Sequence, residues 1–199
     1  MDIGKLEENE INNQAVSSLI GNMRTIINNP TFADVVFLVE QKPIYGHKAI
    51  LAAQCEHFRG MFMNGMKEST QSQIPVKDWS YNSYLLMMEY LYTGSIVNFN
   101  HRVALDLLGL ADAYILDGLK YLCENTLMQN VDNDNVIQFL IDSNKYQAVE
   151  LKKFCINFLI KNFQEVSTSQ GFEELEYYPS LLMEVTKLVV SNVNSKEIS

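Results

Sequence analysis

The residues that could perform chemistry are few and far apart in this sequence. The three histidines are His47, His57 and His101, and no two of them stand at the four-residue step that places a pair of imidazoles on one helix face for a metal. The chain contains no G-x-S-x-G, G-x-x-x-x-G-K or G-x-G-x-x-G motif, so the common signatures of serine hydrolases and nucleotide-binding enzymes are absent. We therefore expect no catalytic residues, no metal site and no cofactor.

Cysteine chemistry is the remaining catalytic alternative. Cys55 and His57 are two residues apart, and on a helix such side chains point about 200° apart, so they do not share a proton without an intervening turn. With Cys123 and Cys155 the cysteines are an odd number at wide spacing, and they form neither a C-x-x-C pair nor a zinc-ligand set. We expect reduced core thiols, and an enzyme with a reactive thiol ranks third among the functional hypotheses.

Length and composition restrict the class of protein. The chain has 199 residues, 47% of them hydrophobic, which suffices for one compact domain and a small companion. Its net charge of −9 disfavours nucleic-acid binding through a broad basic face. No run of about 18 apolar residues marks a membrane span, and the acidic start is unlike a signal peptide. We expect a soluble protein of the cytoplasm or nucleus that binds neither membranes nor nucleic acids.

Hydrophobic spacing predicts a long first helix. Apolar residues recur at three- and four-residue steps from Ala15 to Ile27, which places them on one stripe of a helix that ends near Asn29. Residues 1–13 are polar and are expected to form a lead-in to this helix.

A small sheet is predicted next. The run VVFLV at residues 35–39 and the short apolar piece at 44–45 favour a β-hairpin. Because the run does not alternate, we expect its strand to be covered on both faces by helices. Residues 74–76 favour an edge strand, since Pro75 cannot donate a ladder hydrogen bond.

The rest of the chain has a helical period, and its last third carries no strand signal. Polar turn-forming residues at 130–135 separate a mixed α/β part from an all-helical part. Helices are expected near residues 49–53, 56–63, 84–92, 103–114, 117–128, 136–141, 151–163, 172–175 and 181–190. The predicted organisation is a lead-in at 1–13, a first domain at 14–129, a helical region at 130–191 and a polar tail at 192–199.

Five separated motifs give the sequence a family resemblance. They are DVV at 34–36, GHKAILAA at 46–53, EHFRGMF at 56–62, MKES at 66–69 and EYLYTG at 89–94. In order, spacing and type they resemble the BTB/POZ family over about residues 14–128. The helical segment after it looks like the BACK or 3-box region of cullin-RING ligase substrate adaptors of the propeller-BTB and MATH-BTB types. The resemblance implies an α+β fold: a BTB/POZ domain with a small, short-stranded sheet flanked by helices, followed by an all-helical BACK-like extension.

The resemblance also implies a homodimer. On composition alone, the stripe of the first helix is as compatible with a core-facing helix as with a partner interface. In BTB domains this helix packs across a two-fold axis, so the dimer interface would contain Leu19, Met23, Ile26 and Ile50.

Asp34 and Lys48 have two interpretations. Residues of these types are commonly a helix-capping Asp and a solvated Lys. The family resemblance instead places them together in a charged pocket at the floor of the dimer. A buried ion pair is weak evidence of stability, because desolvation offsets the attraction.

Cullin binding is the sharpest functional expectation. Hydrophobic-x-Glu triplets alone are uninformative, but Met66 and Glu68 stand where cullin-binding BTB domains carry such a motif, and Met suits an adaptable apolar contact. The resemblance assigns Phe62, Met66 and Glu68 to a type-3 cullin contact. The implied function is a non-catalytic substrate adaptor that holds an unknown substrate protein near the ligase, where proximity provides the gain.

One alternative within the same fold stays open: a BTB dimerisation or scaffold module of a transcriptional regulator, without cullin binding. The BTB domain and the helical extension account for all 199 residues. A domain that recognises the substrate is therefore expected on a longer chain, on a partner, or as a surface of the BTB or BACK-like region.

Overall fold

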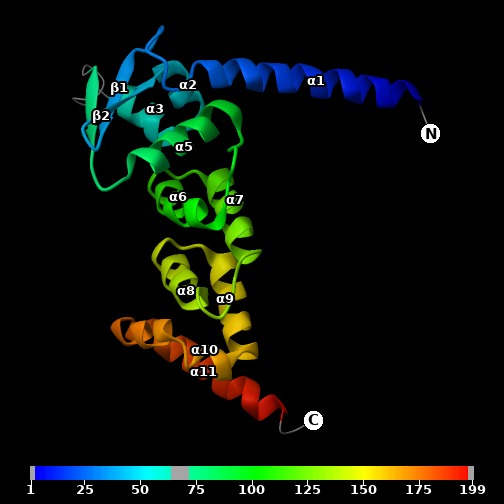
Figure 1. Cartoon of the computed structure of the whole chain (residues 1–199), viewed down its shortest axis with the longest axis vertical. Helices are drawn as coiled ribbons and strands as arrows, with labels where there is room; N and C mark the ends of the chain where they lie inside the picture. The colour runs from blue at the N-terminus through cyan, green and yellow to red at the C-terminus, as the bar shows by residue number, and fades with distance from the viewer. Residues whose placement is uncertain (1–2, 64–71, 197–199) are drawn as a thin grey trace. The chain divides into compact units, whose positions relative to one another are not determined.

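The computed structural model describes residues 3–63 and 72–196. The chain divides into two compact units (Figure 1). The first unit comprises Met1–Asn98 with Ala113–Leu116, and the second comprises Phe99–Asp112 with Asp117–Ser199. Within the described residues, no helix combines the length and apolar character needed to span a membrane.

Among the described residues, a three-stranded sheet forms the centre of the first unit. The strands are β1 (Val35–Val39), β2 (Lys42–Gly46) and β3 (Gln73–Val76), in the order β2-β1-β3. The antiparallel pair β1 and β2 confirms the predicted hairpin, and its two turn residues both have positive φ, as a tight hairpin of two residues requires. β3 pairs in parallel with β1 at the sheet edge and contains the proline, as predicted.

The two faces of β1 are buried to different extents, and neither is exposed. Val35, Phe37 and Val39 are buried, whereas Val36 and Leu38 are half-buried. The side chains of a strand alternate between its two faces, so one face of β1 carries the core and the other is only partly covered. An uninterrupted apolar run does not distinguish a strand that is fully buried on both faces from one that is fully buried on one face only.

Four helices complete the described part of the first unit, and each overlaps a stretch in which the periodicity predicted a helix. The capping of α5 shows why it starts and stops where it does: the Ser80 hydroxyl accepts the Ser83 N–H, and Gly94 ends the helix at φ 68°, a conformation that glycine adopts without strain. The helices are α1 (Ile3–Thr25), α2 (Lys48–Gln54), α3 (Glu56–Met63) and α5 (Tyr81–Thr93).

Both ends of α1 differ from the prediction. The helix begins at Ile3, so it extends through the predicted lead-in, and it ends at Thr25 rather than near Asn29. Asn28 adopts a left-handed φ of 51°, and its side chain accepts the backbone N–H of Tyr45 and donates to the hydroxyl of Tyr81, both at 3.0 Å. These long-range bonds stop the helix earlier than the local Asn-Asn-Pro signal indicates.

An aromatic cluster fills the core between the sheet and the helices. The ring of Phe37 in β1 lies 5.5 Å from Phe58 in α3 and 5.3 Å from Tyr84 in α5. Tyr114 adds a ring 5.2 Å from Phe58, and its hydroxyl donates to that of Tyr84 at 3.3 Å. Burial raises the pKa of Tyr84 well above its ordinary value, so both hydroxyls stay protonated and the pair is neutral.

The described residues of the second unit form helices and turns without a strand, as predicted for the last third of the chain. Its elements are α6 (His101–Ala113), α7 (Asp117–Met128), α8 (Val136–Lys145), α9 (Val149–Lys161), α10 (Phe163–Val166), the 3₁₀-helix η1 (Gln170–Tyr177) and α11 (Pro179–Lys196). The turn that leads into α8 is held by Asp132, whose carboxylate accepts the N–H groups of Asp134 and Asn135. This is the turn and capping chemistry expected of residues 130–135.

A buried carboxyl group joins α7 to α9. Glu124 is 7% exposed. Desolvation raises the pKa of Glu124, an effect that nearby Lys120 opposes. The backbone N–H groups of Glu150 and Leu151, in the first turn of α9, also lie close enough to lower its pKa. The carboxylate therefore lies beside helix N–H groups that have no partner within α9.

Candidate functional site

The apolar stripe of α1 is open to solvent in the isolated chain. All side chains from residue 12 to residue 19 are exposed, and among them Val16 is 55% and Leu19 is 61% exposed. Met23 and Ile26, nearer the attached end of the helix, are half-buried, as is Ile50 in α2. The interpretation as an ordinary core-facing helix therefore fails for Leu19.

The C-terminal end of α1 is fixed to α5 by polar contacts. The Arg24 guanidinium donates to the Glu89 carboxylate at 3.3 Å and to the Ser95 hydroxyl at 3.2 Å. A hollow of about 420 Å³ lies beside this contact, with Ile27, Leu85 and Leu86 among its lining residues. Sequence spacing gave no signal for this contact, because its partners are 65 and 71 residues apart along the chain.

Asp34 caps α2. Its carboxylate accepts the backbone N–H of Lys48 at 2.7 Å, which fits the interpretation of Asp34 as a capping residue. The ammonium group of Lys48 lies 5.4 Å above the ring of Phe62. The Asp34 carboxylate therefore contacts the backbone of Lys48, and the charged pocket at the floor of the dimer stays a prediction.

His47 is held by hydrogen bonds on both ring nitrogens. Nδ1 lies 2.8 Å from the Tyr92 hydroxyl and Nε2 lies 3.2 Å from the carbonyl oxygen of Thr31. Burial raises the pKa of Tyr92 to about 12, so this hydroxyl keeps its proton and donates it to Nδ1. The proton of a neutral His47 then resides on Nε2 and is donated to Thr31, which makes this imidazole a structural link.

The end of α3 holds the described part of the predicted cullin contact. Phe62 is half-buried, and its ring stacks nearly parallel on Phe58, with centroids 5.8 Å apart and an interplanar angle of 14°. The next residue, Met63, is 73% exposed. Met66 and Glu68, the other two predicted contact residues, lie outside the described residues.

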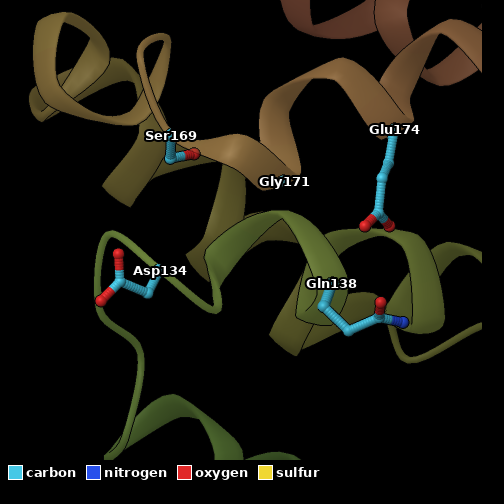
Figure 2. Close-up of a pocket in the computed structure, with 5 residues that line it drawn as sticks. All are labelled: Asp134, Gln138, Ser169, Gly171 and Glu174. Atoms are coloured by element: carbon cyan, nitrogen blue, oxygen red, sulfur yellow. The ribbon is translucent and has the colours of Figure 1, made fainter.

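A polar hollow of about 450 Å³ lies in the second unit, between the start of α8 and η1 (Figure 2). Asp134, Gln138, Ser169, Gly171 and Glu174 line it, and the Glu174 carboxylate points toward α8, from which Gln138 projects. The Gln138 amide donates to Asp142 at 2.6 Å and the Ser169 hydroxyl donates to the Val166 carbonyl at 2.7 Å. The lining is thus acidic, and its Gln138 amide and Ser169 hydroxyl already donate hydrogen bonds within the protein.

The three thiols lie in the core. Cys55, Cys123 and Cys155 are free and buried, as predicted, and the Cys55 thiol points at the Tyr114 carbonyl oxygen, 3.5 Å away. The His57 ring packs on Tyr114 instead, with centroids 4.7 Å apart. Within residues 3–63 and 72–196, no group of three His, Cys, Asp or Glu side chains could hold a metal ion.

We expect these thiols to be inert in the native protein. Burial raises the pKa of Cys123 and of Cys155 to about 12, and it raises that of Cys55 as well. At pH 8 the three groups are therefore protonated, and the thiolate is the reactive form. Titration with a chromogenic disulfide reagent should show no rapid reaction at pH 8 and three thiols after unfolding in guanidinium; a fast-reacting native thiol would contradict the assignment.

The fold and its surfaces define a protein-interaction domain: a small sheet covered by helices, with an exposed apolar helical face. The BTB/POZ domain family matches residues 23–131, and the chain belongs to this family. The match begins within α1 and continues beyond the end of α7. BTB domains mediate protein interactions and are generally non-catalytic.

Relatives share this part of the sequence. The chain is 36% identical over 149 residues to "ARM repeat protein interacting with ABF2" of Arabidopsis thaliana, covering 75% of this chain and 21% of that protein. It is 34% identical over 158 residues to "TD and POZ domain-containing protein 2" of Mus musculus, covering 78% of this chain and 43% of that protein. It thus spans less than half of either relative. The solved BTB domain of human gigaxonin aligns with a TM-score of 0.45 and 23% identity, over 55% of this chain and 87% of that one.

Proposed function

We propose that the protein is a dimeric substrate adaptor of a type-3 cullin-RING E3 ubiquitin ligase, active in the cytoplasm, the nucleus or both. The observation that carries the proposal is the solvent-exposed apolar stripe of α1, in a chain that belongs to the BTB/POZ family. An exposed apolar helix face on a soluble domain is typical of a surface that a partner covers.

Dimerisation is the first step of the proposal. Leu19, Met23, Ile26 and Ile50 form the interface with a second copy, related to the first by a two-fold axis. The burial of Leu19 alone removes a large aliphatic side chain from water in each copy, and full burial of such a side chain contributes about 1.5–3 kcal/mol. Asp34 and Lys48 lie at the floor of this dimer and have an architectural role.

Cullin binding is the second step. Phe62, Met66 and Glu68 form the contact, and the support for it is the family position of the hydrophobic-x-Glu motif together with the location of Phe62 at the end of α3. The ring of Phe62 is supported from below by Phe58, so its position does not depend on the partner. A pre-organised aromatic side chain loses little entropy when it is covered.

The helices that follow supply the remaining part of the proposal. Residues 14–129 form the BTB domain and residues 130–191 the BACK-like region, with a tail at 192–199. The helical region lengthens the cullin-facing groove. The chain contributes no chemical group to ubiquitin transfer, and a substrate protein bound to either copy of the dimer gains an increased effective concentration near the ligase.

A titration against the N-terminal domain of a type-3 cullin tests the proposal. We expect a Kd below about 10 μM, which corresponds to roughly −7 kcal/mol. The double substitution Met66→Ala with Glu68→Gln should raise the Kd at least about tenfold, because the contact loses both its apolar side chain and its charge. The measurement is isothermal calorimetry on the intact chain.

A matched control removes the same residue types elsewhere. Met183→Ala with Glu173→Gln changes an exposed methionine and an exposed glutamate of the second unit, and it should leave the Kd within about twofold of the wild type. If the wild-type chain shows no binding below 10 μM although it is dimeric, the cullin adaptor is wrong. The scaffold module of a transcriptional regulator then becomes the better explanation of the dimer.

A further inference from the structure

Arg24 is the residue of α1 that forms an ion pair with the rest of the first unit. Its guanidinium uses Nε for the Glu89 carboxylate and Nη2 for the Ser95 hydroxyl, at 3.3 and 3.2 Å. The side chain of Arg24 is 37% exposed and that of Glu89 is 16% exposed. One forked side chain thereby holds two different acceptors, which a lysine ammonium does less well.

The acceptors of Arg24 are themselves fixed. The same Glu89 oxygen also accepts the backbone N–H of Val97 at 3.1 Å. The Thr93 hydroxyl lies 2.7 Å from the carbonyl oxygens of both Glu89 and Ser95, and it accepts the Ser95 N–H at 3.2 Å. Arg24 is therefore bound to a rigid turn at the end of α5 and not to a freely moving side chain.

The open part of α1 extends from this attachment. Every side chain from residue 12 to residue 19 is exposed, so burial of these side chains does little to fix the direction of that part of the helix. Val16 lies eight residues before Arg24, about 12 Å along the axis at 1.5 Å per residue. A tilt of about 15° at the attachment would displace Val16 by about 3 Å, which is enough to misalign a close-packed interface.

We propose that Arg24 is a positioning residue for the homodimer: by binding Glu89 and Ser95 it sets the direction of α1, and so presents Leu19 and Met23 to the second copy in the geometry that an isologous interface requires. This inference rests on the proposed homodimer. Because the interface is two-fold symmetric, a substitution at Arg24 acts twice in each dimer.

Arg24→Gln tests the inference through the dimer Kd, measured by sedimentation equilibrium on the full chain. Loss of the ion pair in a partly exposed setting is expected to cost about threefold per copy, and so about tenfold in Kd. Arg24→Lys keeps the charge but not the fork, and should lie between the wild type and Arg24→Gln. Glu89→Gln added to Arg24→Gln should raise the Kd less than it does in the wild-type background, because the two residues share one contact.

A second ion pair separates positioning from general stability. Lys120 binds Asp112 at 2.8 Å, with side chains 20% and 34% exposed, and it lies in the second unit. Lys120→Gln should lower the thermal midpoint by as much as Arg24→Gln does, and leave the dimer Kd within about twofold of wild type.

The outcomes are distinct. A tenfold rise in Kd for Arg24→Gln alone, with partial rescue by lysine, supports the positioning role. A wild-type dimer whose Kd is unchanged by Arg24→Gln overturns that role and leaves the homodimer standing. A wild-type chain that is monomeric at every concentration overturns the homodimer, and the role of Arg24 in it, together.

Discussion

The double substitution Leu19→Asp with Met23→Asp is expected to convert the dimer into monomers that remain folded. Leu19 is 61% exposed in the isolated chain and Met23 is half-buried. The free energy of unfolding of one copy therefore falls little when Leu19 is replaced by a charged residue. A two-fold interface brings four new carboxylates together, and none has a partner. Burying an unpaired carboxylate costs several kcal/mol, so we expect the dimer Kd to rise by at least about a thousandfold, or 4 kcal/mol.

Sedimentation velocity over a range of concentrations measures this change. The control is Met183→Asp with Leu188→Asp, which places two carboxylates on exposed apolar residues of α11, 57% and 39% exposed in the native chain. It adds the same charge to the protein and should leave the dimer intact. A double variant at Leu19 and Met23 that still sediments as a dimer would show that the two copies meet through another surface.

The elements with strong local signals were predictable. The hairpin followed from VVFLV and the short apolar piece at 44–45, and it is confirmed. The turn before α8 followed from the polar residues at 130–135, where the Asp132 carboxylate accepts the N–H groups of Asp134 and Asn135. In these cases the residues that cause the structure stand within a few positions of it, so a single stretch of sequence contains the whole interaction.

The errors concern interactions between distant parts of the chain. The helix α1 ends at Thr25 because the Asn28 side chain reaches Tyr45 and Tyr81, and periodicity carries no information about such partners. The attachment of Arg24 was missed for the same reason. The unequal burial of the two faces of β1 depends on which helices cover the sheet, so a run of apolar residues alone could not predict it.

The candidate site was predictable only in part. Spacing identified the α1 stripe, and its exposure could not be known before the packing of the chain was seen. The contact between Lys48 and the ring of Phe62 joins two helices that the sequence identified separately. The motif at Met66 owes its significance to its position in a family pattern, because a hydrophobic-x-Glu triplet has no distinctive chemistry of its own.

Phe58→Ala is expected to cause the largest loss of stability among single substitutions in the first unit. The side chain is fully buried and contacts the rings of Phe37, Phe62 and Tyr114, with centroids 5.5, 5.8 and 5.2 Å away. Truncation of a buried phenylalanine leaves a cavity that rigid aromatic neighbours cannot close, and costs about 3–5 kcal/mol. This is a large part of the 5–15 kcal/mol by which domains are stable.

Urea unfolding followed by circular dichroism measures the loss as a lower midpoint with an unchanged slope. The matched control is Phe32→Ala, the same substitution in the same unit at a side chain that is 91% exposed, and it should change the stability by no more than about 0.5 kcal/mol. Comparison of the two variants separates the effect of lost core packing on stability from the effect of replacing phenylalanine by alanine. Since Phe62 stacks on Phe58, the fraction of Phe58→Ala that stays folded should also bind the cullin domain more weakly, whereas Phe32→Ala should bind it as the wild type does. Equal stability of the two variants would contradict the aromatic core that supports the proposed contact.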